Sequence, residues 1–220
     1  MSDTDDVNLD FDRQSRTGLA EAVFCRGKSL EQLKTICMRV ADADKPMLFT
    51  RLSPRQFRRL EVDFPNLLDY DPVSRTALCR PVPMELLQVP VAVVSGGSSD
   101  LPVAREAIRT LTFYGHQALE IHDVGVAGLW RVLERLDDLR RCRIIICVAG
   151  MDAALPTVVG GLVPAAIIAV PTSVGYGMVK GGETALRSLL VSCAPGVTVT
   201  NIDNGYGAAC AAIRILNSFS

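Results

Sequence analysis

The chain lacks any apolar run long enough to cross a membrane, although 49% of its 220 residues are hydrophobic and its mean hydropathy is +0.25. Its apolar residues come in short runs such as 144–149, whereas a membrane helix needs about 18 in succession. The N-terminus carries no basic and apolar segment of the signal-peptide kind and is acidic instead. We therefore expect a cytoplasmic protein with no membrane partner.

Disulfide and zinc patterns are also missing. The cysteines number seven, which is odd, and neither a Cys-x-x-Cys pair nor a zinc-like Cys/His spacing occurs. We expect a reducing compartment in which most thiols behave as small buried hydrophobes. The formal net charge is only −1, so no global field would recruit nucleic acid.

Charge and proline divide the chain near residue 88. Residues 1–88 hold 13 of the 23 Lys and Arg and 14 of the 24 Asp and Glu. Capping boxes at Ser29 and Ser53 predict a helix through about residue 40 and another over 54–60. We interpret residues 1–88 as a smaller helical and extended accessory region with an acidic tail, two short helices and a proline-rich linker.

Residues 89–220 alternate between strand and helix patterns. We expect strands at 89–95, 117–121, 143–149, 165–170 and 197–202. We expect helices at 102–114, 127–141, 155–163, 182–191 and 206–216. Five such units predict an α/β fold, a doubly wound, flavodoxin-like parallel sheet covered by helices on both faces.

Ligands of such sheets bind at the carboxyl ends of the strands, so the loops there are the candidate site. The loop after the first expected strand reads Gly97-Ser98-Ser99-Asp100. Its glycine, its hydroxyls and the following helix N-terminus could hold an anion, or Ser99 and Asp100 could simply cap that helix. It is neither a G-x-G-x-x-G fingerprint nor a Walker loop.

Acidic residues follow the next two strands. His122 and Asp123 follow the second expected strand directly. A lone histidine at such a position is more often a loop residue than a base. Asp152 follows Gly150 and Met151 in an otherwise apolar loop. It could cap the next helix, or it could transfer protons with a pKa raised by apolar surroundings.

The last two loops contribute further candidates. The glycine-rich loop after the fourth strand offers side chains or backbone for ligand contact at Ser173, Gly175, Tyr176 and Lys180. Cys193 comes just before the fifth strand, which we expect to be buried, and polar residues crowd the end of that strand at Asn201, Asp203 and Asn204. The last segment therefore holds a candidate nucleophile.

Several of these motifs resemble the PurE-type aminoimidazole ribonucleotide carboxylases, namely Gly97-Ser98-Ser99-Asp100, the loop from Ala149-Gly150 to Leu155-Pro156, and Ala194-Pro195-Gly196-Val197. The likeness to the LarB branch is closer. It covers Asp123-Val124-Gly125-Val126-Ala127-Gly128, Ala149-Gly150-Met151, residues 170–177, residues 193–207, Arg13 with Arg16-Thr17-Gly18 and Glu21-Ala22-Val23, and Leu48-Phe49-Thr50-Arg51.

The resemblance implies a pyridinium-3,5-biscarboxylic acid mononucleotide synthase of nickel-pincer nucleotide cofactor biosynthesis. Such enzymes carboxylate the pyridinium ring of nicotinic acid adenine dinucleotide with CO₂ or bicarbonate and hydrolyse the phosphoanhydride to release AMP. The essential thiol of the branch falls at Cys193 and its carboxylate base at Asp152, and we favour Asp123 over His122 as a second catalytic group. PurE relatives form octamers, so a homo-oligomer, and most simply an octamer, is expected. Mg²⁺ would accompany the substrate phosphates, because no dedicated ligand set is legible.

Two residues depart from the branch pattern. Asp152 stands where Glu is expected, which shortens a base by one methylene, and Trp130 stands where His is expected. Two alternatives stay open. A PurE-type carboxylase or mutase acting on aminoimidazole ribonucleotide would need His122 but not Cys193. A non-enzymatic nucleotide-binding module would bind without turnover.

Overall fold

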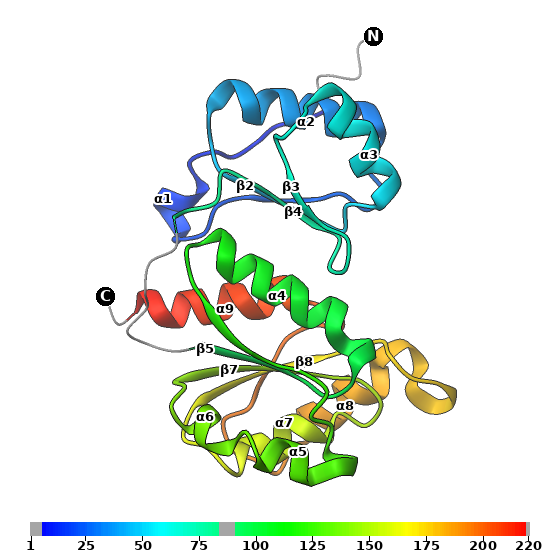
Figure 1. Ribbon diagram of the computed structural model, residues 1–220, viewed down its shortest axis with the longest axis vertical. Coiled ribbons are helices and arrows are strands. Elements are labelled where there is room, and N and C mark those ends of the chain that lie inside the picture. Colours follow the sequence, from blue (N-terminus) through cyan, green and yellow to red (C-terminus); the bar gives the residue numbers. More distant parts are fainter. Residues whose placement is uncertain (1–5, 84–90, 219–220) are drawn as a thin grey trace. The chain divides into compact units, whose positions relative to one another are not determined.

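The computed structural model describes residues 6–83 and 91–218. Contacts divide the chain into two compact units near residue 83, and Figure 1 follows both in sequence colours. Over the described ranges, every helix is too short or too polar to cross a bilayer.

The N-terminal unit is built on a four-stranded sheet that was not predicted. The two predicted helices form beside it, and residues 84–90 of the expected linker lie outside the described residues. Its strands are β1 (Ala22–Phe24), β2 (Met47–Thr50), β3 (Asp69–Asp71) and β4 (Thr76–Cys79). They lie in the order β1-β2-β4-β3, with β1 parallel to β2 and the other pairs antiparallel. Strands of three or four residues are too short to show an alternating pattern in the sequence.

Both capping boxes of this unit form as predicted. Ser29 Oγ accepts a hydrogen bond from the Gln32 amide at 3.1 Å while Gln32 Oε1 accepts one from the Ser29 amide at 2.9 Å, and Ser53 pairs with Gln56 in the same way. The helices they open, α2 (Leu30–Ala43) and α3 (Pro54–Asp63), each run three residues further than expected. They pack on the same side of the strands (Figure 1) and bury an apolar core against the sheet.

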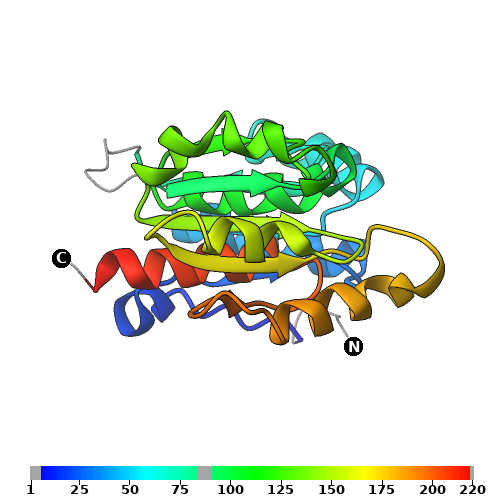
Figure 2. The ribbon, with the colours of Figure 1, turned by 90° about the horizontal axis from the view of Figure 1, so that it is seen from below.

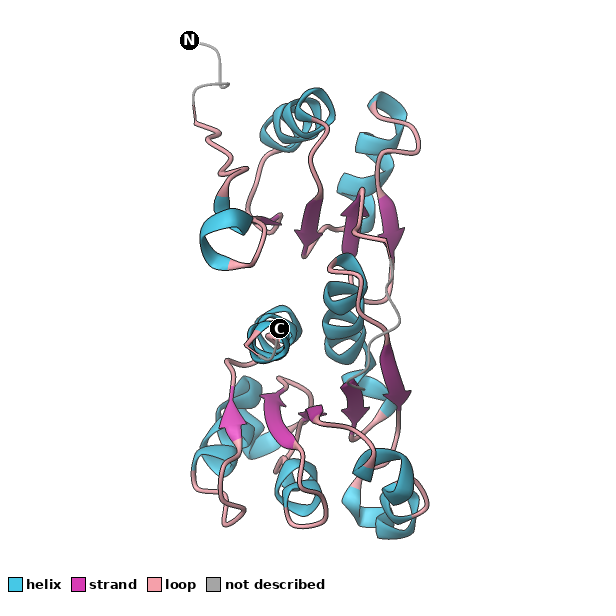
Figure 3. Ribbon diagram, turned by 90° about the vertical axis from the view of Figure 1, so that its left-hand side faces the viewer, coloured by secondary structure: helices cyan, strands magenta, loops and turns pink. Residues whose placement is uncertain are grey.

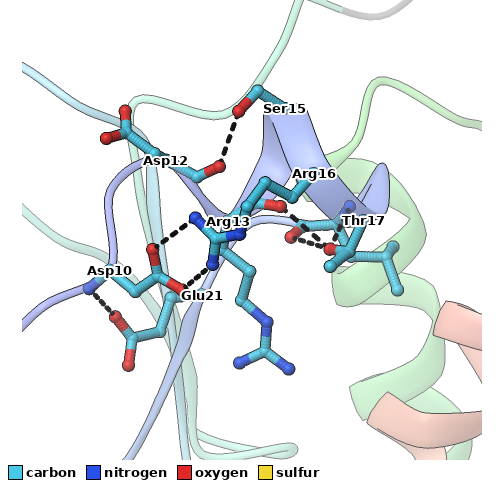
Figure 4. A network of polar contacts seen from close by, with 8 residues as sticks. Asp10, Asp12, Arg13, Ser15, Arg16, Thr17 and Glu21 are labelled. Atoms are coloured by element: carbon cyan, nitrogen blue, oxygen red, sulfur yellow. Dashed lines mark hydrogen bonds and ion pairs between the residues drawn. The ribbon is translucent and has the colours of Figure 1, made fainter.

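A small polar network surrounds α1 (Arg13–Thr17), as Figure 4 shows. Arg16 donates to both carboxylate oxygens of Asp10, at 3.1 and 2.5 Å, and the Asp10 amide donates to Glu21 Oε2 at 2.6 Å. The hydrogen bond and positive charge of Arg16 lower the pKa of Asp10. The Arg16 and Glu21 side chains of this N-terminal motif are therefore used to fix the chain ahead of β1.

The C-terminal unit contains a five-stranded, fully parallel sheet in the order β6-β5-β7-β8-β9. The strands are β5 (Val91–Ser95), β6 (Ala118–Ile121), β7 (Ile144–Ala149), β8 (Ala166–Pro171) and β9 (Thr198–Val199). Strands β5 and β7 are buried along their whole length, as near-continuous apolar runs at the centre of a parallel sheet should be. This confirms the predicted doubly wound, flavodoxin-like fold.

Helices cover both faces of this sheet, giving the three layers seen in Figures 1 and 3. One face carries α4 (Leu101–Phe113) and α9 (Gly205–Asn217). The other carries α5 (Leu129–Leu133), α6 (Leu136–Arg140), α7 (Ala154–Gly160) and α8 (Glu183–Leu190). Figure 2 views this second face, with α7 lying over the strands.

Two expected elements differ from the structure. The helix expected over 127–141 is broken into a 3₁₀ turn (Val126–Gly128), α5 and α6. The strand expected at 197–202 pairs only at Thr198–Val199, where Thr198 is exposed rather than buried. This strand lies at the edge of the sheet, and an edge strand receives hydrogen bonds from one side only.

Candidate active site

A cavity of about 720 Å³ opens at the carboxyl edge of the parallel sheet, within the size range of small-molecule sites. The loops that follow β5, β6, β7 and β8 line it. The lining residues are Gly96, Gly97, Ser98, Ser99, Asp100, Asp123, Gly125, Val126, Ala127, Ala149, Gly150, Met151, Asp152, Ala153, Ala154, Leu155 and Val174.

Asp100 is buried at the base of this cavity, with 4% of its surface exposed. Its Oδ2 accepts a hydrogen bond from the Gly97 amide at 2.9 Å, and its Oδ1 accepts one from Thr172 Oγ1 at 2.6 Å. Asp100 therefore joins the loops after β5 and β8, while the exposed Ser98 and Ser99 present their side chains nearer to solvent.

Left-handed backbone occurs on the loops at the same edge, as it also does in the N-terminal unit. All non-glycine residues with positive φ in the described part of the C-terminal unit lie on loops that follow strands, namely Asp123, Met151, Ala153, Lys180 and Asp203. Such conformations cost of order 1–3 kcal/mol each and cluster at functional sites. The sequence gives no sign of them.

The acidic residue after β6 faces solvent at the cavity wall. Asp123 is exposed and lies 3.4 Å from Arg131 Nη1 through its Oδ1. The neighbouring His122 is not among the lining residues. Its ring is held by Ser95 Oγ at 3.1 Å and by Glu120 Oε2 at 3.3 Å.

The loop after β7 brings Asp152 to the cavity but leaves it exposed. The expectation that apolar surroundings desolvate this carboxylate is therefore wrong for the single chain. Its Oδ1 accepts a 3.4 Å hydrogen bond from the Ala154 amide at the start of α7. Gly150 permits the close approach of this loop to the next one, because a Cβ there would lie 2.6 Å from both Thr172 Oγ1 and the Val174 carbonyl.

The loop after β8 reaches the cavity through Val174 rather than through the polar residues that were predicted. The Ser173 amide donates to Asp203 Oδ1 at 2.8 Å, and the Asp203 amide donates to the Pro171 carbonyl at 2.8 Å. Asp203 thus braces this loop. Tyr176 is 81% exposed and does not line the cavity. The other predicted residues of the last two loops do not line it either, namely Ser173, Gly175, Lys180, Asn201, Asp203 and Asn204.

Cys193 is exposed, whereas the other six cysteines are buried. It precedes β9 and therefore lies away from the carboxyl end of that strand, and it does not line the cavity. Its neighbour Ser192 is hydrogen-bonded through Oγ to Thr157 Oγ1 of α7 at 2.7 Å. The chain next to Cys193 is therefore tied to α7, whose first residues line the cavity.

Burial makes the thiolate form of several of the other cysteines unfavourable. Burial raises the pKa of Cys25 and of Cys37 to about 12, and it raises the pKa of Cys147 as well. Because the thiolate is the nucleophile, these buried cysteines are poor candidates for covalent chemistry.

The cavity is acidic. Its described lining includes three aspartates and neither lysine nor arginine. Over residues 6–83 and 91–218, no group of three or more His, Cys, Asp or Glu side chains is arranged to hold a metal ion. The residues present therefore do not form a dedicated metal site.

Several lining and bracing residues were not singled out as candidates from the sequence. Val126, Ala127 and Leu155 supply apolar walls, and Thr172 holds Asp100. Thr172 could have been predicted as a site residue, because a hydroxyl side chain directly after a buried strand lies at the carboxyl edge of the sheet. The apolar residues carried no such signal.

Family models match both units. Residues 1–81 match the LarB/PurE-like N-terminal domain, and residues 90–220 match AIR carboxylase. An uncharacterized protein of Methanocaldococcus jannaschii is 36% identical over 210 residues, which cover 92% of this chain and 80% of that protein.

Other relatives match the C-terminal unit alone. The N5-carboxyaminoimidazole ribonucleotide mutase of Methanocaldococcus jannaschii is 31% identical over 131 residues, covering 57% of this chain and 78% of the mutase. The crystal structure of Treponema denticola PurE is similar with a TM-score of 0.52 at 23% identity, covering 60% of this chain and 83% of that one.

Proposed function

Because the chain belongs to the LarB family, with a LarB/PurE-like N-terminal domain joined to an AIR carboxylase domain, we propose that it carboxylates the pyridinium ring of nicotinic acid adenine dinucleotide and hydrolyses the phosphoanhydride to release AMP. The product is pyridinium-3,5-biscarboxylic acid mononucleotide, an intermediate of nickel-pincer nucleotide biosynthesis. CO₂ or bicarbonate is the co-substrate.

An exposed carboxylate at the cavity is the observation that carries this proposal beyond the family. A pyridinium ring is a cation, and the exposed Asp152 favours a cation there, whereas Asp123 is paired with Arg131 and Asp100 is bonded to Gly97 and Thr172. The phosphates of the same substrate need other partners. The Ser98 and Ser99 hydroxyls at the cavity, and the more distant Tyr176 and Lys180, are proposed to contact the nucleotide.

The proposed chemistry begins with Cys193. Its thiolate adds to a carbon of the electron-poor ring and converts the pyridinium into a neutral dihydropyridine, whose enamine carbon attacks CO₂. A base then removes the proton from the carboxylated carbon, and the electron pair expels the thiolate and restores aromaticity. Net, a ring proton is exchanged for a carboxylate, and no oxidant is consumed.

Asp152 is proposed as the base and Asp123 as a second carboxylate in the same step. Both line the cavity. Cys193 is exposed and does not line the cavity of the single chain, and its proposed role rests on the likeness to the family. Anhydride cleavage adds water across the P–O–P linkage. Mg²⁺ would arrive with the substrate phosphates, held by at most one or two carboxylates and water. Among residues 6–83 and 91–218, no cluster of side chains forms a site for it.

The decisive experiment incubates the protein with nicotinic acid adenine dinucleotide, bicarbonate and Mg²⁺ and follows AMP and the carboxylated mononucleotide by mass spectrometry. Cys193→Ser and Asp152→Asn should abolish carboxylation. The matched controls Cys142→Ala, a buried thiol, and Asp137→Asn, an exposed carboxylate on α6, should retain it. No product from the unaltered protein, or full carboxylation by Cys193→Ser, would overturn the proposal.

A second assay, with N5-carboxyaminoimidazole ribonucleotide as substrate, tests the alternative. A PurE-type mutase should convert N5-carboxyaminoimidazole ribonucleotide with Cys193→Ser fully active and His122→Asn inactive. His122 is hydrogen-bonded to Ser95 and Glu120 and does not line the cavity. We therefore expect no conversion of this substrate and no loss of activity in His122→Asn.

A further inference from the structure

The wall of the cavity after β6 is a short loop with an unusual backbone. Asp123, Gly125, Val126 and Ala127 all line the cavity from it. Asp123 has φ of +57°, in a region that non-glycine residues seldom occupy. Something must hold this segment in place if Asp123 is to present its carboxylate at a fixed position.

Arg131, on α5, makes three contacts with that loop. Its Nη1 donates to the Asp123 carbonyl at 2.9 Å and lies 3.4 Å from Asp123 Oδ1. Its Nη2 donates to the Gly125 carbonyl at 3.4 Å. One planar guanidinium therefore spans two carbonyls and a carboxylate of the cavity wall, which is a geometry that the point charge of lysine cannot reproduce.

Gly128 allows the guanidinium to reach this position. A Cβ at residue 128 would lie 2.7 Å from Arg131 Nε and 3.1 Å from Nη2. The backbone of Gly128, with φ −114° and ψ 67°, does not need glycine for its conformation. The absence of a side chain at 128 is instead explained by the path of Arg131 past it.

We propose that Arg131 is the positioning residue of the cavity wall: its guanidinium fixes the left-handed conformation of Asp123 and orients that carboxylate toward the substrate. The inference rests on the proposed function only for the role of Asp123 in turnover. The contacts of Arg131 with the loop, which we call the clamp, do not depend on that role. Through these contacts Arg131 acts on Asp123 and Gly125, both of which line the cavity.

The test compares Arg131→Gln, Arg131→Lys and Gly128→Ala with the control Arg135→Gln. Arg135 pairs with Asp138 at 2.9 Å, away from the loop, so its loss should leave turnover and loop unchanged. Arg131→Gln should lower kcat for carboxylation by roughly ten- to a hundred-fold, because a misplaced catalytic group loses rate on that scale. KM should change far less, and lysine should restore only part of the rate.

Gly128→Ala separates the clamp from the charge of Arg131. It displaces the guanidinium while keeping the arginine, so it should give the same kcat defect as Arg131→Gln. The double variant should be no worse than either single variant, since two changes that break one interaction are not additive. Amide hydrogen exchange over 123–128 should rise in both variants and stay at the wild-type rate in Arg135→Gln.

Unchanged exchange over 123–128 in Arg131→Gln would overturn the clamp, whatever the activity. So would a kcat equal to that of the Arg135→Gln control, or additive defects in the double variant. If the unaltered protein has no carboxylase activity, the proposed function fails instead. The exchange experiment over 123–128 still decides the inference, because it needs no substrate.

Discussion

Replacing Thr172 by valine should destabilise the C-terminal unit more than the loss of a buried hydroxyl that donates to a neutral acceptor. Thr172 is fully buried, and its Oγ1 donates to Asp100 Oδ1 at 2.6 Å. Valine keeps the shape but removes the donor, which leaves a carboxylate oxygen of a residue only 4% exposed without that hydrogen bond. A hydrogen bond to a charged group is worth about 1.5–3 kcal/mol, and orphaning its buried partner falls at the upper end.

We therefore expect the free energy of unfolding to fall by about 2–3 kcal/mol. For a unit of roughly 130 residues, about 4 °C of Tm corresponds to each kcal/mol, so Tm should fall by roughly 8–12 °C. Urea and thermal unfolding can be followed by the fluorescence of Trp130, the single tryptophan of the chain, which lies in this unit.

Thr110→Val is the matched control. Thr110 is equally buried, but its Oγ1 donates at 2.8 Å to the Glu106 carbonyl, a neutral acceptor within α4. Its loss should be about 1 kcal/mol or less, and Thr172→Ser, which keeps the hydroxyl, should also lose little. Equal losses for Thr172→Val and Thr110→Val would refute the reasoning that Asp100 depends on this donor.

Three further predictions follow from burial and exposure. At about pH 8 a thiol reagent should titrate one cysteine per native chain, Cys193, and all seven after unfolding, because burial raises the pKa of Cys25 and Cys37 to about 12; two or more rapidly reacting native thiols would contradict this. Those two thiols stabilise the N-terminal unit fully below their ordinary pKa of 9.0 and lose that contribution as pH rises toward 12. The free energy of unfolding should therefore fall above pH 9, and less steeply in Cys25→Ala/Cys37→Ala; identical slopes would contradict the assignment. Trp130, Leu190 and Val191 are exposed by 62%, 66% and 78%, so light scattering should give a multiple of the 23.7 kDa chain mass, and a monomer would contradict the proposed homo-oligomer.

The fold of the C-terminal unit was predictable because its central strands are apolar on both faces. The run at 144–149 is fully buried in β7, and such a run has few alternatives in an α/β chain. The errors have two sources. Thr198 of β9 is exposed at the sheet edge, and the strands of the N-terminal unit, although β2 and β4 are fully buried, are too short to carry a pattern.

The site was predictable only as a location. The rule that parallel sheets bind ligands at their carboxyl edge placed Gly97, Asp123 and Asp152 at the loops that surround the cavity. This rule could not tell which polar atoms are available to a substrate. Asp100 and Asp203 were expected to contact substrate, yet each has an oxygen committed to a backbone amide of a loop. That distinction depends on three-dimensional contacts between residues far apart in the sequence.

The hydrogen bond between Asp100 and Thr172 also has an evolutionary consequence, because it joins positions that are 72 residues apart. A mutation at either position alone leaves a buried polar atom without its partner, and an apolar residue at 100 would also leave the Gly97 amide without its acceptor. Drift at these two positions should therefore be correlated among descendants of a common ancestor. Chains that keep an acid at 100 should keep a hydroxyl at 172, even where the surrounding loops diverge.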